Sequence, residues 1–208
     1  LKPDSPVPDG LDWNLWLGPA EKVPYNVSRH KAWYDWWAYS GGDALAGDAS
    51  HVMDLARMVL GDPDHPVSVC CIGGRYLYDD GRDIPDIQSI IYDYGDFSLS
   101  CVSSEFGDYL MKSDTRVRYG DFFPDWQFNS TRIEIYGTEG MMYLGRHGGG
   151  WQIFDHGGEV VAQEYGFFPD MEHQRDFIRS IKTRKTPNGD IIQGHKSTTL
   201  VHMANISY

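Results

Sequence analysis

The sequence of 208 residues predicts an α+β fold, in which an open, largely antiparallel β-sheet carries helices on one face. Three observations support this prediction. A glycine-flanked helical stretch comes first, several short strand-like runs follow it, and two helical stretches end the chain. The apolar content of 41%, with 14% aromatic residues, is typical of a globular chain. We therefore expect a single domain over residues 1–208.

Residues 1–40 are expected to follow an extended, turn-rich path, because prolines spread along them exclude a long helix. The segment is rich in Trp and Tyr and also contains Arg29 and His30. Most of these rings are expected to pin the loop to the body of the domain. The alternative is a platform for a sugar or cyclitol ring, since long aromatic loops are often functional.

Residues 41–61 predict one amphipathic helix. Gly41 and Gly42 break the chain before it, Asp43 is the expected N-cap, and Gly61 stands where a C-cap belongs. Apolar residues recur at spacings of three and four, which is the period of a helical stripe. They are Leu45, Ala49, Val52, Ala56, Val59 and Leu60.

Asp48, His51 and Asp54 lie three residues apart on this helix, so their side chains share one side of it. Polar residues on amphipathic helices are mostly solvated or structurally hydrogen-bonded, and periodicity alone favours that role. The chemical alternative is acid–base work, because a histidine titrates near neutral pH and a neighbouring carboxylate can orient it.

Strand signals fill residues 66–163. Three β-branched and aromatic runs come first, with Gly95–Asp96 as a hairpin turn, and residues 107–130 read as a loop. Four further runs indicate a meander, whose turns contain His147 and His156; these histidines, and His65, are expected to be solvated. Residues 168–208 predict two helices, the first ending before Pro187 and the second beginning near Gly194.

The stretch GGDALAGDASHVMDLARMVLG resembles the glycine-rich turn and DxxxHxxD helix of the Gfo/Idh/MocA family of NAD(P)-dependent oxidoreductases. Lys2–Ala20, Thr131–Leu144 and the stretch from His173 onward are similar to other parts of that family, in the same order. The resemblance implies the C-terminal, substrate-binding domain, with a fold like the C-terminal domain of glyceraldehyde-3-phosphate dehydrogenase. It also implies that a Rossmann domain precedes Leu1.

The resemblance further implies hydride transfer to or from a sugar, cyclitol or related polyol. His51 becomes the candidate acid/base, and Asp48 its partner or a substrate anchor. The family usually places that acidic residue four positions before the histidine, where this chain has Gly47, so the direction of any contact changes. Candidate substrate-binding residues are Arg29, His30, Trp33, Trp36 and His173.

No glycine-rich GxGxxG turn follows a strand, so no residue here is predicted to bind the cofactor. NAD or NADP is expected in the missing domain. A metal site is the weaker chemical alternative: His51, Asp48, Asp54 and the distant His173 could supply ligands, but no HExxH pattern is present, and we predict none.

The net charge of −12 argues against a nucleic-acid or anionic membrane partner, and no apolar run approaches a membrane span. Two adjacent cysteines and a single third one match no disulfide framework, which indicates a reduced, cytoplasmic compartment, although a leader upstream of Leu1 could have been lost. The alternatives to a dehydrogenase domain are a non-catalytic oligomerisation or ligand-binding module, and altered sugar chemistry. The resemblance implies a homodimer or tetramer formed through the sheet face.

Overall fold

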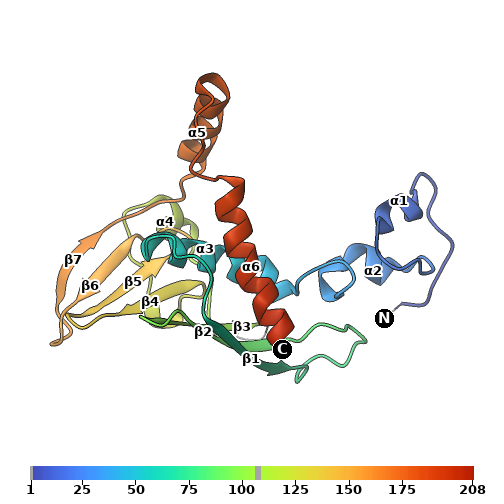
Figure 1. The fold of residues 1–208 in the computed structure, drawn as a ribbon, viewed down its shortest axis with the longest axis horizontal. Helices are drawn as coiled ribbons and strands as arrows, with labels where there is room; N and C mark the ends of the chain where they lie inside the picture. Colours follow the sequence, from blue (N-terminus) through green and yellow to red (C-terminus); the bar gives the residue numbers. More distant parts are fainter. Residues whose placement is uncertain (1, 106–108) are drawn as a thin grey trace. The chain divides into compact units, whose positions relative to one another are not determined.

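The computed structural model describes residues 2–105 and 109–208, except for the side chains of residues 43 and 44. The chain divides into two compact units (Figure 1). The first unit contains Leu1–Ala49, His65–Phe106 and Leu200–Tyr208, and the second contains Ser50–Asp64 and Gly107–Thr199. The single domain over residues 1–208 stays a prediction. Within the described residues, no helix is both long enough and apolar enough to cross a membrane.

The first unit opens with short helices separated by irregular chain, as the prolines predict. These are α1 (Trp13–Leu17), α2 (Val27–Lys31) and the 3₁₀ helix η1 (Trp33–Asp35). Asp12 caps α1 and Asn26 caps α2 through side-chain oxygens that accept backbone N–H groups. The segment has a small core of its own, formed by Trp13, Leu17 and Tyr25.

The glycine-flanked helix is confirmed, but it is not uniform. It begins as a π-helix, η2 (Asp43–Ala49), and continues as α3 (Ser50–Val59). Met53 is buried, whereas Val59, which the stripe predicts to be inside, is 39% exposed. The stripe residues Leu45, Ala49 and Ala56 are buried as predicted, and Val59 is the last residue of α3. Gly61 has a φ of 84°, as its predicted capping role requires. The predicted cap Asp43 lies outside the described side chains.

The first unit contains a three-stranded antiparallel sheet in the order β1 (Ser68–Gly74), β2 (Ile87–Asp93) and β3 (Ser98–Ser104). The end of α6 (Ile191–Ser207) covers one face of it. The Tyr92 hydroxyl donates to the backbone oxygen of Leu200 at 3.0 Å, and the Gln88 amide donates to Asn205 at 3.1 Å. The hairpin at Gly95 is confirmed, and that glycine has a φ of 86°.

The second unit contains the predicted meander as a separate four-stranded antiparallel sheet. Its strands are β4 (Arg132–Tyr136), β5 (Met141–Gly145), β6 (Trp151–Phe154) and β7 (Val160–Glu164). The α+β class is therefore confirmed, with the strands divided between two sheets. The loop predicted over residues 107–130 contains two short helices, α4 (Thr115–Tyr119) and η3 (Trp126–Phe128).

The prediction that His147 is solvated is wrong. Its side chain is only 6% exposed, its Nδ1 lies 3.1 Å from the Thr131 hydroxyl, and its ring stacks on Phe168. The three glycines that follow have positive φ angles and bring the backbone against neighbouring segments. A Cβ at Gly150 would lie 1.8 Å from the backbone oxygen of Glu164. This close approach folds the turn inward and buries the histidine, whereas His65 and His156 are exposed as expected.

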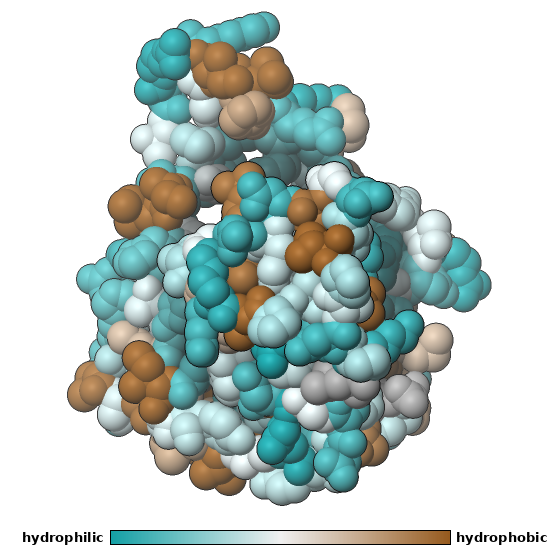
Figure 2. Space-filling view, turned by 90° about the vertical axis from the view of Figure 1, so that its right-hand side faces the viewer, coloured by the Kyte–Doolittle hydropathy of each residue, from teal (hydrophilic) through white to brown (hydrophobic). Residues whose placement is uncertain are grey.

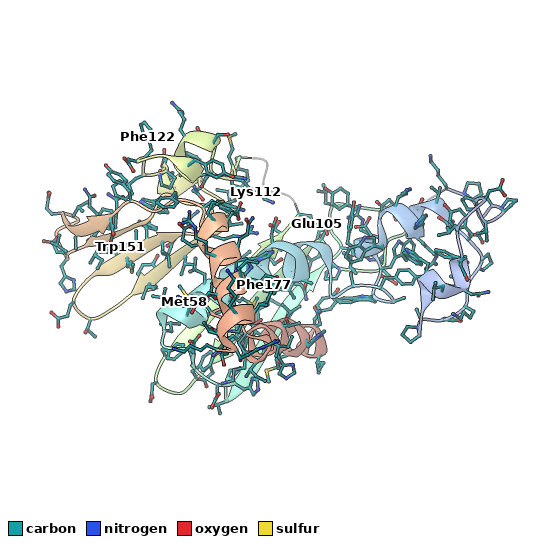
Figure 3. The ribbon with its side chains drawn as sticks, turned by 90° about the horizontal axis from the view of Figure 1, so that it is seen from above. Met58, Glu105, Lys112, Phe122, Trp151 and Phe177 are labelled. Atoms are coloured by element: carbon teal, nitrogen blue, oxygen red, sulfur yellow. The ribbon has the colours of Figure 1, made fainter. Side chains whose placement is uncertain are left out.

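Helix α5 (Asp170–Thr183) confirms the first of the two C-terminal helices. Its Asp176 is buried and accepts the Asn188 backbone N–H at 2.7 Å, which fixes the turn that follows. The apolar residues of α5 reach the surface at the top of Figure 2. Phe177 on α5 is 59% exposed and Met58 on α3 is 60% exposed (Figure 3).

Candidate functional site

The three polar residues of the predicted motif have different surroundings. His51 is exposed on the first turn of α3, and Asp48 is half-buried in η2. Asp54 is exposed, and its Oδ1 accepts a hydrogen bond from the Ser197 hydroxyl at 2.5 Å. The catalytic roles of His51 and Asp48 stay predictions, whereas Asp54 has a structural contact with α6.

Arg57 explains why Ser197 is held in place. Its side chain is 1% exposed, and its Nη1 donates to the Ser197 hydroxyl at 2.8 Å. The remaining guanidinium donors bond to the backbone oxygen of Pro63 and to Gln193. A buried guanidinium must have its donors satisfied, so this cluster fixes α3 to the first turns of α6 within the second unit.

His30, a predicted substrate-binding residue, lies within a cluster of aromatic rings. Its ring centroid is 5.4 Å from that of Trp16 and 5.7 Å from that of Tyr25, and its Nδ1 is 3.3 Å from the Tyr25 hydroxyl. Trp13 packs against the same group, stacked on Trp16. These contacts favour the pinning role that the sequence also allows.

Trp36 and Trp33 differ in how much of their rings they present. Trp36 is 4% exposed, and the Arg29 guanidinium carbon lies 4.0 Å from its ring centroid. This cation–π contact covers a ring face that a sugar would need. Trp33 is 47% exposed and remains available for stacking. His173 is exposed on the first turn of α5, in the second unit.

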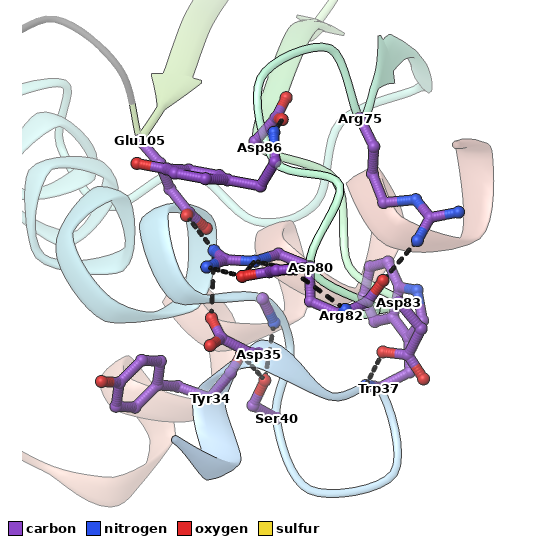
Figure 4. A network of polar contacts seen from close by, with 12 residues as sticks. Tyr34, Asp35, Trp37, Ser40, Arg75, Asp80, Arg82, Asp83, Asp86 and Glu105 are labelled. Carbon is purple, nitrogen blue, oxygen red and sulfur yellow. Dashed lines mark hydrogen bonds and ion pairs between the residues drawn. The ribbon is translucent and has the colours of Figure 1, made fainter. Parts of the chain in front are cut away.

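A polar network that the sequence does not reveal joins the 33–37 segment to the loop between β1 and β2 (Figure 4). Arg82 is its centre. One guanidinium nitrogen, Nη1, lies 3.2 Å from Asp35 and 2.6 Å from Glu105, while Nη2 donates to Asp80 at 2.8 Å. The guanidinium also lies over the Tyr78 ring, 4.1 Å from its centroid. An arginine with several charge-assisted hydrogen bonds holds its partners in fixed geometry.

The charges of this network change the acidity of its members. The hydrogen bond from Arg82 lowers the pKa of Asp80 to about 2, and the same bond, with the surrounding carboxylates, raises the pKa of Arg82. Burial alone would raise the pKa of Asp86. Backbone N–H groups from Tyr76 to Tyr78 outweigh that effect and hold it below its usual value.

A cavity of about 810 Å³ opens within the first unit, between the residues that follow η1 and the end of α6. None of the seven predicted catalytic and substrate-binding residues lines it. The sequence shows Trp37 as part of the aromatic segment, but no local signal pairs that segment with the C-terminal helix. The lining residues are Trp37, Tyr39, Ser40, Gly41, His202, Asn205, Ile206 and Tyr208.

The described residues contain no cluster of side chains suited to a metal ion. Over residues 2–105 and 109–208, leaving out the side chains of residues 43 and 44, no group of three or more His, Cys, Asp or Glu side chains is placed to hold an ion.

The architecture is α+β, with antiparallel sheets, a glycine-preceded helix that carries His51, and two C-terminal helices. Residues 1–106 match the sequence profile described as "Oxidoreductase family, C-terminal alpha/beta domain", of the Gfo/Idh/MocA group. The chain belongs to this oxidoreductase family, as its sequence motifs predict. A comparison with curated proteins found no match.

Solved structures share this fold. UDP-N-acetylglucosamine 3-dehydrogenase from Acidithiobacillus ferrooxidans is 13% identical with a TM-score of 0.57, over 79% of this chain and 46% of that one. The WlbA dehydrogenase from Bordetella pertussis, in complex with NADH and UDP-GlcNAcA, is 17% identical with a TM-score of 0.52, over 85% and 46%. An Agrobacterium radiobacter oxidoreductase in complex with NAD+, L-tartaric acid and magnesium is 16% identical with a TM-score of 0.53, over 88% and 51%. The chain thus spans about half the length of these proteins.

Proposed function

We propose that this chain is the substrate-binding part of an NAD(P)-dependent oxidoreductase that acts on a sugar, cyclitol or related polyol by hydride transfer. The family match over residues 1–106, which includes the His51 helix, carries the proposal. Two of the similar structures are sugar-nucleotide proteins by their descriptions, which supports a carbohydrate substrate class. Their low identity leaves the particular substrate to experiment.

In this proposal His51 removes the proton from a substrate hydroxyl, while hydride leaves the carbon that bears this hydroxyl. An exposed imidazole on the first turn of a helix can reach a substrate hydroxyl and exchange its proton with water. Asp48 is proposed as its tuning partner or as a substrate anchor.

A bound nicotinamide cofactor would accept that hydride, and the N-termini of α3 and α5 do not fit its pyrophosphate. A dinucleotide pyrophosphate is usually held at a helix N-terminus after a glycine-rich turn. Here α5 opens with Asp170 and Glu172, whose charges would repel phosphate, and α3 continues directly from η2. We therefore assign NAD or NADP to a separate nucleotide-binding part of a longer protein.

The experiment is His51→Ala in the full-length oxidoreductase that we propose contains this chain, assayed by NAD(P)H absorbance with candidate polyols. We expect kcat to fall about 10²- to 10⁴-fold with nucleotide affinity nearly unchanged. The matched control is His65→Ala, another exposed histidine. Wild-type kcat and KM in His51→Ala would show that His51 has no catalytic role.

Asp48→Asn separates the two roles proposed for that residue. A tuning partner stabilises protonated His51, so its loss would shift the pH–rate profile to lower pH. A substrate anchor would mainly raise KM and leave the profile in place. A variant with wild-type profile and wild-type KM would remove Asp48 from the proposed site.

A second candidate role is self-association through the three-stranded sheet. One face of that sheet exposes Ile72 at 70%, Ile91 at 55% and Val102 at 71%. The strand register places these residues on the same face, because Ile72 and Val102 both pair with Ser89. An apolar face of this kind supports a symmetric dimer that buries on the order of 1,600 Å² or more.

Light scattering tests this association. We expect the wild-type chain to be dimeric in the micromolar range and Val102→Lys to be monomeric, because a charge on this face would be desolvated by the partner. Tyr136→Lys is the control, since Tyr136 is 72% exposed but lies on the other sheet. A monomeric wild-type chain across this range would exclude the dimer.

A further inference from the structure

The cavity in the first unit has aromatic walls from two distant parts of the chain. Trp37 follows η1, and Tyr208 follows α6. Their ring centroids are 6.5 Å apart and their planes are tilted by 34°. The volume of about 810 Å³ is within the usual range of roughly 300–1,000 Å³ for small-molecule sites.

Hydrogen bonds on both sides hold this groove in shape. Asp83 accepts the Trp37 backbone N–H at 2.8 Å, which links the aromatic wall to the Arg82 loop (Figure 4). On the opposite wall, the Asn205 amide donates to the backbone oxygen of Gly41 at 2.8 Å. The Ser40 hydroxyl donates to the backbone oxygen of Tyr34 at 2.7 Å. Walls fixed before binding lower the conformational cost of holding a ligand.

The lining favours a neutral ligand. It contains no Asp, Glu, Lys or Arg, so a phosphate or carboxylate would lose its hydration without gaining an opposite charge. It does contain hydrogen-bonding side chains, including the exposed imidazole of His202. A pyranose or cyclitol ring has both properties that this lining needs: an apolar C–H face for an aromatic ring and hydroxyl groups at its edge.

We propose that this groove binds a neutral sugar ring, with Trp37 as the stacking platform and His202 as a contact to ring hydroxyls. The sugar class rests on the proposed function, but the site does not, because none of the residues proposed for catalysis lines the groove. Trp37 thus takes the stacking role that the sequence suggests for Trp36, whose ring is covered by Arg29.

The test uses the 208-residue chain, with N-acetyl-D-glucosamine as the neutral probe and saturation-transfer NMR as the readout. We expect saturable binding by the wild type and a dissociation constant at least about tenfold higher for Trp37→Ala. His202→Ala, a change at an exposed side chain, should weaken binding about two- to fivefold without affecting folding. Trp33→Ala is the matched aromatic control, because Trp33 is exposed but does not line the groove.

Three results would overturn the proposal: no saturable binding by the wild type, wild-type affinity in both Trp37→Ala and His202→Ala, or equal loss in Trp33→Ala. Uridine diphosphate alone should not displace the sugar, and displacement would contradict the neutral character of the groove. His51→Ala in this chain should bind the probe as the wild type does. If His51 has no catalytic role, kcat stays unchanged in His51→Ala, whereas if the groove does not bind sugar, the wild-type chain does not bind the probe. The two failures are therefore distinguishable.

Discussion

Replacing Arg82 with Met should destabilise the first unit substantially. The methionine side chain keeps a similar volume and an apolar stem, but it lacks the guanidinium that pairs with Asp35, Asp80 and Glu105. It also loses the contact of that guanidinium with the Tyr78 ring. The carboxyl groups of Asp35 and Glu105 are 14% and 9% exposed, and both would lose this cation. Their burial makes the change costly, because a buried charge is poorly solvated.

The expected loss follows from that burial. Removing one partner of a buried ion pair typically costs about 3–5 kcal/mol, and the Arg82 side chain is 13% exposed, so we take about 3 kcal/mol. This loss corresponds to a fall in Tm of roughly 6–12 °C for a chain of this size. Thermal and urea unfolding followed by tryptophan fluorescence at pH 7 would measure it. The control is Arg175→Met, at a pair that is 71% and 54% exposed, where the change should stay within about 0.5 kcal/mol.

The pH dependence of this loss tests its cause. Without Arg82, the buried carboxylates of Asp35 and Glu105 lose a cation that favours their charged forms. Protonation removes the need for that cation, so the difference in stability between variant and wild type should be largest at pH 7 and shrink toward pH 4. A loss below about 1 kcal/mol, or one that does not change over this range, would refute the electrostatic explanation.

The remaining predictions concern other parts of the chain. The pKa of Asp80 is lowered in the folded state, so its ionised form stabilises the wild type above pH 3.8, the ordinary pKa of an Asp, and this contribution is lost as pH falls toward 2. Asp80→Asn should remove only about 1 kcal/mol of this pH-dependent stability, because the Asp80 side chain is 48% exposed. Ser197→Ala should reduce the free energy of unfolding by about 1–3 kcal/mol, measured by urea titration, since Arg57 and Asp54 lose their shared partner. Calorimetry at micromolar concentration should show no saturable binding of NAD(H) or NADP(H) to this chain alone, and saturable binding would contradict our assignment of the cofactor.

The sequence is sufficient for the fold class because its signals are local. Alternation of residue types indicates a strand within a few residues. In the same way, Gly95 indicates a hairpin turn and Gly61 the end of a helix. The division of the strands into two sheets is different. Consecutive strands pair within each sheet, and no local pattern shows that β3 ends one sheet and β4 begins another. The helical stripe assigns Leu45, Ala49 and Ala56 correctly to the interior, but it omits the buried Met53 and includes Val59, which is 39% exposed at the end of α3.

The candidate site is harder to predict because the partners of each polar side chain are distant in sequence. Asp54 belongs to a motif that suggests chemistry, yet its hydroxyl partner Ser197 is 143 residues away. His147 stands in a glycine-rich turn that suggests solvent, but the close approach of residues 150 and 164 buries it. In both cases the local residue types are compatible with two environments, and the tertiary contact selects one.

The adjacent residues Trp36 and Trp37 show how such contacts decide function. They are the same residue type at adjacent positions, so a sequence argument does not separate them. Arg29, one α-helical element earlier, covers the ring of Trp36, whereas Asp83 holds the backbone of Trp37 from 46 residues away and leaves its ring at the groove. Asp83 follows Arg82, whose contact with Asp35 fixes the same segment. Arg29 therefore covers the ring of Trp36, while the loop between β1 and β2 holds the backbone of Trp37, so Arg82→Met should weaken binding of the sugar probe as well as folding.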